Sequence, residues 1–224
     1  MHIPDGLFVN GGVIHGATAA VSVAACGVAI WRANKTLGQR QVPLLGMSAA
    51  FVFAAQMLNF PIAGGTSGHF LGAVLAAVLL GPWNAFLVMT VVLVIQCLLF
   101  ADGGLTALGT NIFNMALLGG VGGYGVFRAV RTVLPRARGF FVAATAIAAW
   151  ASVVLASAAC AAELALAGTI PLRVAMPAMV GIHALIGVGE AVITAAALYL
   201  VLAERPDLVA SWTVSSHAIE GTRT

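Results

Sequence analysis

The sequence has very little charge. Only 8% of its 224 residues are Asp, Glu, Lys or Arg, and Lys35 is the single lysine, whereas a soluble domain carries about 25% charged residues. Hydrophobic residues make up 61% of the chain, and its mean hydropathy is +1.05. This composition excludes an ordinary soluble domain, which would have too few polar side chains to present to water, and indicates an integral membrane protein.

Paired cysteines and nucleotide-binding loops are also missing. Cys26, Cys97 and Cys160 each lie alone in an apolar stretch, so neither a zinc site nor a disulfide framework is indicated. The sequence contains no G-x-x-x-x-G-K-[ST] loop for ATP, so the energy for any transport has to come from another protein. The formal net charge is only +3, and the basic residues form no dense patch in the sequence. No nucleic-acid partner is therefore expected.

Proline, glycine and charged residues divide the apolar sequence into seven expected spans. They lie near 12–31, 43–58, 69–80, 84–100, 111–127, 139–162 and 176–202. A membrane-crossing helix needs about 20 residues, so the chain has room for about seven crossings and no separate globular domain. We therefore expect an all-α integral membrane protein in contact with membrane lipid, with one transmembrane domain over 1–204 and a polar cytoplasmic tail over 205–224.

The third of these spans is short because a glycine-rich segment precedes it. This segment runs from Asn59 to Gly68 and contains Pro61. Irregular backbone is tolerated at membrane depth only where protein or a cavity covers it. We therefore expect the segment to dip into the helix bundle, which makes it a candidate for a binding site.

The Lys and Arg residues define an orientation. Only Arg173 falls on one side of the expected membrane, while the other side carries Arg32, Lys35, Arg40, Arg128, Arg131, Arg136, Arg138, Arg205 and Arg223. The positive-inside rule places that basic side in the cytoplasm. We therefore expect an external amino terminus and a cytoplasmic carboxyl terminus, in a bacterial-type cytoplasmic membrane.

The chain start is a candidate chelator. No positively charged region precedes an apolar stretch as in a signal peptide, so we expect Met1 to remain in the mature chain. The Met1 amine, the His2 amide nitrogen and the His2 imidazole Nδ1 can then close fused five- and six-membered rings around one metal. An all-nitrogen planar set suits Ni(II) or Cu(II), with Co(II) as a neighbouring choice, whereas Mg²⁺ and Ca²⁺ prefer oxygen.

Two further features support this hypothesis over a chance histidine at position 2. Pro4, Asp5 and Gly6 favour a tight turn that folds the terminus back onto the helix ends. His69, directly after the dipping segment, is the best candidate for a fourth nitrogen ligand. The residues expected to support the metal-binding set from outside are Asn59, Thr66, Ser67, His15 and Asp102.

Two ionisable residues in the last span have no evident partner in the sequence. His183 and Glu190 are seven residues apart and so lie on roughly one helix face. Ionisable groups at membrane depth are costly, and they raise a functional question. A buried proton relay and a paired structural contact are both open, and we favour the structural contact.

Four ordered motifs carry a family resemblance. They are Met1-His2-Ile3-Pro4-Asp5-Gly6, Met57-Leu58-Asn59-Phe60-Pro61-Ile62, Gly64-Gly65-Thr66-Ser67-Gly68-His69 and Asp102-Gly103-Gly104-Leu105-Thr106-Ala107-Leu108-Gly109. The chain resembles the CbiM/NikM family, the substrate-binding membrane subunits of energy-coupling-factor transporters for cobalt and nickel. The motifs extend from Met1 to about Met115, and the resemblance is looser beyond that residue.

This resemblance implies a function and a set of partners. It implies uptake of Ni²⁺ or Co²⁺ as transported substrate, with the Met1 amine, the His2 amide and imidazole, and His69 as ligands. It also implies a transmembrane coupling subunit, cytoplasmic ATPase subunits and a small accessory membrane subunit. Under this hypothesis the chain is a transport subunit and not an enzyme.

Two alternatives compete with a metal-binding subunit. Gly65-Thr66-Ser67-Gly68 fits G-x-S-G, and with His183 as a base it would suit an intramembrane serine protease. That alternative requires Ser67 within hydrogen-bond reach of His183. A vitamin-binding subunit of the same transporter class would need a roomy pocket with aromatic walls. Neither alternative explains the Met1-His2 start.

Overall fold

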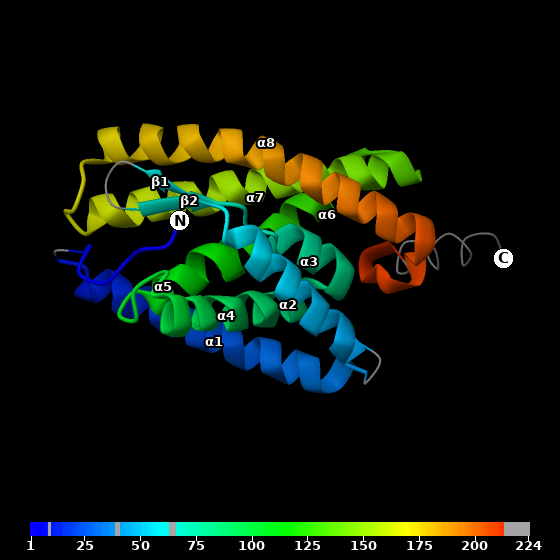
Figure 1. The fold of residues 1–224 in the computed structure, drawn as a ribbon, viewed down its shortest axis with the longest axis horizontal. Helices are drawn as coiled ribbons and strands as arrows, with labels where there is room; N and C mark the ends of the chain where they lie inside the picture. The colour runs from blue at the N-terminus through cyan, green and yellow to red at the C-terminus, as the bar shows by residue number, and fades with distance from the viewer. Residues whose placement is uncertain (9, 39–40, 63–65, 213–224) are drawn as a thin grey trace.

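The computed structural model of the chain describes residues 1–8, 10–38, 41–62 and 66–212 (Figure 1). Its helices in this part are α1 (Gly12–Thr36), α2 (Val42–Gln56), α3 (Ala73–Leu80), α4 (Pro82–Phe100), α5 (Leu108–Ile112), the π-helix η2 (Phe113–Gly122), α6 (Gly123–Val133), α7 (Arg138–Leu166), α8 (Leu172–Glu204) and the 3₁₀ helix η3 (Pro206–Leu208). A single antiparallel hairpin within the same residues joins β1 (Asn59–Ile62) to β2 (Thr66–His69).

The long helices coincide with the expected spans. Four helices, α1, α4, α7 and α8, are long and apolar enough to cross a membrane, and α2 is a shorter apolar helix. α5, η2 and α6 follow one another without a break from Leu108 to Val133, around the expected span 111–127. The expectation of a helical, multi-pass membrane protein is therefore confirmed.

The third expected span differs most from the structure. A continuous helix over 69–80 was expected, but the helix α3 begins only at Ala73 and has 8 residues. Gly72 adopts φ 71°, a left-handed conformation that ends the extended β2 strand and starts the helix. Nearly all of α3 is buried, so its short backbone is covered by protein rather than by lipid.

The dipping segment forms the β-hairpin. Asn59 pairs with His69, and Ile62 pairs with Thr66. β2 is largely buried and packs on α8, whereas Asn59 and Phe60 are exposed. The intervening residues 63–65, including Gly64 and Gly65 of the third motif, lie outside the described residues.

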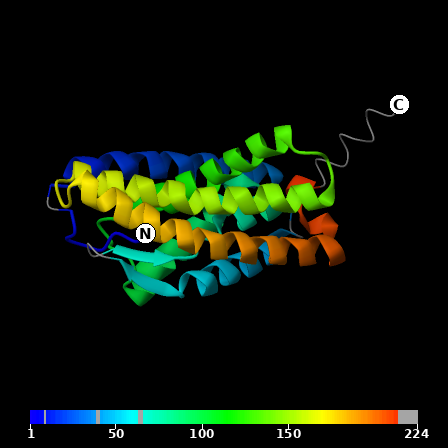
Figure 2. The ribbon, with the colours of Figure 1, turned by 90° about the horizontal axis from the view of Figure 1, so that it is seen from above.

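The amino terminus and η3 lie at opposite ends of the bundle (Figure 1). Figure 1 shows the amino terminus beside the hairpin at one end, and η3 beyond α8 at the other. Figure 2, from above, again places the amino terminus next to the hairpin. This arrangement requires the chain to cross the bundle an odd number of times.

The segment after α8 folds onto the bundle instead of leaving it at once. η3 follows α8 directly, Val209 is buried, and the ring of Trp212 stands edge-on to Phe141 with 5.1 Å between ring centroids. The first eight residues of the expected tail therefore belong to the described fold, while 213–224 lie outside the described residues.

Candidate metal site

The first three residues are docked inside the protein. Met1 and Ile3 have no exposed surface, and His2 is 3% exposed. The Ile3 N–H donates to Asn111 Oδ1 at 2.9 Å, Asn111 Nδ2 donates back to the Ile3 carbonyl at 3.2 Å, and Gly104 N donates to the same carbonyl at 2.8 Å. These contacts satisfy the Ile3 peptide groups. The chain start is thus a fixed internal element.

The loop between α4 and α5 forms the platform for this segment. Gly103 adopts φ 91°, and a Cβ atom on Gly104 would collide with the backbone nitrogen of Asp5. The Asp5 carboxylate accepts hydrogen bonds from the amides of Leu105 and Thr106 at 3.0 and 2.8 Å. These hydrogen bonds, led by that of the Thr106 hydroxyl, hold the pKa of Asp5 below its usual value. The Asp5 turn therefore anchors the segment to the loop.

His2 contacts a carboxylate and a second imidazole. Its Nδ1 lies 3.1 Å from Asp102 Oδ1. Its ring stacks on that of His69, with 4.6 Å between centroids and 25° between planes. Burial lowers the pKa of His2, although Asp102 opposes this shift. The imidazole is therefore neutral at pH 7. Because Nδ1 faces a carboxylate, which only accepts, the ring proton is on Nδ1 and the lone pair is on Nε2.

His69 presents its second ring nitrogen to the site. Its Nδ1 lies 2.7 Å from the carbonyl oxygen of Phe70. Because a carbonyl only accepts, Nδ1 carries the proton and Nε2 carries the lone pair. Nε2 is buried and has no hydrogen-bond partner among the described residues. A backbone partner on the far nitrogen is a common way to orient a metal-binding imidazole.

The Met1 amine is buried beside the hairpin. It donates to Ser67 Oγ at 3.4 Å. Burial lowers its pKa from 8.0 to about 5, because the charged ammonium is poorly solvated there. The amine is therefore neutral at pH 7, the form that coordinates a metal.

Side chains of α2 and α8 hold the backbone that directly follows His69. Glu190 on α8 accepts hydrogen bonds from the amides of Leu71 and Gly72 at 2.9 and 2.6 Å. Gln56 on α2 donates to the Leu71 carbonyl at 2.8 Å. Two other helices, α2 and α8, thus fix the chain next to His69.

An open cavity of about 360 Å³ reaches this cluster. The residues that line it include His2, Thr66, Ser67 and Asp102. Among the described residues, no three His, Cys, Asp or Glu side chains gather closely enough to form a metal cage. A metal site here would therefore need donors besides the His, Cys, Asp and Glu side chains, and the Met1 amine is the nearest candidate.

The donors are not yet arranged around one point. Lone pairs of two stacked imidazoles run side by side rather than converging, and His2 Nδ1 faces Asp102. A planar four-nitrogen set requires the His2 ring to turn and its Nδ1 to leave Asp102. In this structure the candidate donors therefore lie close together but do not converge on one point.

The predicted supporting residues have different surroundings. Ser67 contacts the Met1 amine and Asp102 contacts His2. Thr66 is directed toward Met179 Sδ at 3.1 Å, whereas Asn59 is exposed on β1. His15 bonds Thr110 Oγ1 at 2.9 Å and stacks on Phe8. Among the described contacts, none joins His15 to Met1, His2 or His69.

The protease geometry is not formed. Ser67 Oγ accepts from the Met1 amine, and His183 Nδ1 bonds the Met179 carbonyl at 2.7 Å. No hydrogen bond between Ser67 and His183 occurs in the described part of the chain. Ser67 therefore lies beside the Met1 amine instead of beside a general base.

Sequence reasoning missed two residues with direct roles at the site. Asn111 holds the Ile3 backbone from both sides, a contact that nothing in the sequence indicated. Glu190 holds the backbone after His69, although its partner had been unknown. Their isolation as polar residues in apolar spans was the available signal, but it does not identify the partner.

The fold and the site define a class of protein: a multi-pass membrane protein that buries its own amino terminus beside two histidines. A family model described as cobalt uptake substrate-specific transmembrane region matches residues 2–208. The chain therefore belongs to the CbiM family, and it is a substrate-specific transmembrane component of a cobalt/nickel uptake transporter rather than an enzyme. This confirms the sequence-based function and excludes the protease and vitamin-binding alternatives.

Similar proteins agree with this assignment. The putative fused nickel transport protein NikMN of Archaeoglobus fulgidus is 44% identical over 211 residues, which cover 93% of this chain and 68% of that protein. A putative metal transport protein of Haloquadratum walsbyi is 41% identical over 93% of both chains. The crystal structure of a truncated transition metal transporter matches with a TM-score of 0.82 and 38% identity, over 90% of this chain and 98% of that one.

Proposed function

We propose that this chain captures Ni²⁺ or Co²⁺ with four nitrogen atoms: the Met1 amine, the His2 amide, His2 Nδ1 and His69 Nε2. The observation that carries the proposal is the burial of Met1 and His2 against His69, with the two imidazoles stacked. Nitrogen donors in a planar set suit these two metals.

The metal enters through the 360 Å³ cavity beside His2. Asp102 is the first charged group on this route, and its carboxylate attracts a cation. Coordination through His2 Nδ1 then separates this atom from Asp102, moves the ring proton from Nδ1 to Nε2 and removes the proton from the His2 amide. The stacked pair opens as His2 turns toward the amine.

The proposal includes partners and an orientation. The chain has no ATP-binding loop of its own, so cytoplasmic ATPase subunits drive uptake through a transmembrane coupling subunit, and a small accessory membrane subunit completes the complex. By the positive-inside rule, the arginine-rich loops support an orientation with the proposed metal site on the outer face of a bacterial-type cytoplasmic membrane.

Metal titration of histidine variants tests the donor set. His69→Ala and His2→Ala each remove one proposed donor, and we expect each to weaken Ni²⁺ and Co²⁺ binding by more than about 100-fold, beyond the usual effect of a supporting residue. His15→Ala is the matched control, because His15 contacts Thr110 and Phe8 instead of the cluster. Unchanged binding by His69→Ala would remove His69 from the site.

A further inference from the structure

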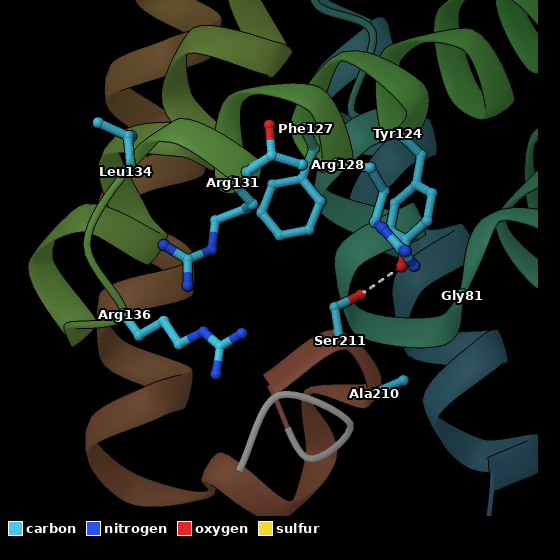
Figure 3. Close-up of a pocket in the computed structure, with 10 residues that line it drawn as sticks. Gly81, Tyr124, Phe127, Arg128, Arg131, Leu134, Arg136, Ala210 and Ser211 are labelled. Carbon is cyan, nitrogen blue, oxygen red and sulfur yellow. Dashed lines mark hydrogen bonds between the residues drawn. The ribbon is translucent and has the colours of Figure 1, made fainter. Parts of the chain in front are cut away.

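A second pocket lies at the other end of the bundle. It encloses about 640 Å³ and is lined mainly by α6, the loop after it and the segment after η3. Figure 3 shows Arg131 and Arg136 on one side and Arg128 beside Tyr124 on the other. Among the described residues that line the pocket, none is Asp or Glu.

One of these arginines is held in place without being neutralised. Arg131 Nη1 donates to the Pro135 carbonyl at 2.9 Å, and its guanidinium carbon lies 5.6 Å from the Phe141 ring centroid. Neither contact supplies a negative charge. In the described part of the chain, no ion pair involves the three pocket arginines. Several guanidinium N–H groups of Arg131 therefore remain for a ligand.

Three like charges around one pocket favour an anion with several oxygen atoms. Guanidinium groups match phosphate because each offers two parallel N–H donors. The positive-inside rule alone accounts for basic residues on this side of the membrane. It does not account for their position around a pocket or for the fixed side chain of Arg131. The pocket chemistry thus indicates a phosphate group.

We propose that this pocket binds the phosphate of an anionic glycerophospholipid from the leaflet that faces the arginine-rich loops. Free phosphate also offers anionic oxygen atoms, but exposed apolar side chains near the pocket in sequence favour a lipid. Val133 lies between the pocket residues Thr132 and Leu134 and is 79% exposed, and Phe140 at the start of α7 is also exposed. Such side chains suit contact with acyl chains, while Tyr124 and Phe127 line the pocket itself. Basic pockets between helices are suited to phospholipid headgroups.

Lipid retention by the full-length protein tests this proposal. The protein is purified in detergent, incubated with equal amounts of phosphatidylglycerol and phosphatidylcholine, and analysed by native mass spectrometry. We expect selective retention of phosphatidylglycerol. Arg131→Gln/Arg136→Gln should reduce that retention by about tenfold, since each arginine contributes to anion attraction near the surface.

A matched variant separates the pocket from general charge. Arg32→Gln/Lys35→Gln removes the same charge from the same end of the bundle, where these residues lie over Trp83 and Trp31, and it should retain the lipid. Arg128→Gln, on an exposed part of α6, provides a milder pocket variant if the double replacement does not fold. We expect it to weaken retention as well.

Four outcomes would overturn the proposal. The first is equal retention of phosphatidylglycerol and phosphatidylcholine, and the second is a loss of phosphatidylglycerol in the Arg32/Lys35 variant equal to that in the Arg131/Arg136 variant. The third is displacement of phosphatidylglycerol by an equal concentration of inorganic phosphate. The fourth is that Arg128→Gln or the Arg131/Arg136 variant retains the lipid but no longer binds its transporter partners. The third outcome would indicate a soluble anion. The fourth would indicate an acidic protein surface.

Discussion

The carboxylate of Glu190 accepts a 2.6 Å hydrogen bond from the backbone amide of Gly72. Its other oxygen accepts from Leu71 at 2.9 Å. Because Gly72 starts α3 with φ 71°, this contact fixes the bend just after His69. A carboxylate of α8 thus supports a proposed ligand that it does not touch.

Replacing Glu190 should therefore weaken metal binding. In Glu190→Ala the two amides lose their acceptor, His69 gains freedom, and we expect affinity for Ni²⁺ or Co²⁺ to fall about 10- to 100-fold. Glu190→Gln keeps one acceptor oxygen and should lose less. Isothermal titration of the purified proteins measures the difference.

The control for this prediction is Glu204→Ala, which removes an exposed carboxylate at the end of the same helix. It should bind metal as the wild type does. If Glu190→Ala remains folded and also binds metal at wild-type strength, the hydrogen bonds that Glu190 accepts from the backbone after His69 have no influence on metal binding.

Gly104 should accept no side chain. A Cβ atom there would collide with the backbone nitrogen of Asp5, so Gly104→Ala should push the amino-terminal segment away from the loop. We expect metal binding to fall at least tenfold, as for loss of a residue that orients a ligand. Gly27→Ala is the control, because a Cβ atom there meets nothing within 4 Å. Equal binding by both variants would show that docking of the segment is unnecessary.

Most of the fold could be predicted because lipid imposes simple rules. Long apolar runs bounded by Pro, Gly and charge can satisfy their backbone only as helices, and α1, α4, α7 and α8 appear near the expected ranges. The hairpin was not predicted as strands. Its residues Asn59 to His69 lack a clear alternating pattern, and its pairing depends on cover from α8.

The sequence predicted the candidate donors but not the residues that support them. Met1, His2 and His69 were proposed because their nitrogen atoms suit metal binding, and the structure places the three residues close together. The contact between His2 and Asp102, across 100 residues, depends on the fold of the loop. Asn111 gave no sign that it holds Ile3, since one polar residue in a span fits many partners.

The orientation can be measured with site-specific labels. Cysteine introduced at positions within 128–138 should react only after the membrane is opened, whereas cysteine within 101–110 should react with an impermeant reagent on intact cells. The native cysteines are first replaced by Ala or Ser. The opposite labelling pattern would place the proposed metal site on the cytoplasmic side and exclude direct capture of the metal from outside.

Metal binding should depend on pH in a defined way. The Met1 amine, with its pKa lowered to about 5, and His2, with its pKa lowered below 6.5, are already neutral at pH 7. Coordination at pH 7 then releases about one proton, from the His2 amide, instead of the two expected for an exposed chain end. Binding should weaken more steeply as the pH falls through 5, because the amine then becomes protonated.

Titration calorimetry in buffers with different ionisation enthalpies counts these protons. Release of about one proton at pH 7 supports a buried neutral amine and an amide ligand. Release of none would argue against the amide nitrogen as a ligand. Release of two or more would show that the amine is protonated before the metal binds.

The central claim is that the metal needs the free chain start, since three of the four proposed donors belong to Met1 and His2. An amino-terminal extension converts the amine into an amide and also cannot fit where Met1 is fully buried. The same extension at the carboxyl terminus is the matched control.

The decisive measurement is isothermal titration of both extended proteins and the native protein with Ni²⁺ and Co²⁺, after mass spectrometry has shown Met1 to be present and deformylated. The terminal chelate predicts that binding is lost with the amino-terminal extension and kept with the carboxyl-terminal one. Native-strength binding by a folded, amino-terminally extended protein would contradict it, and the ligands would then have to be sought among His15, His69, Asp102 and His183.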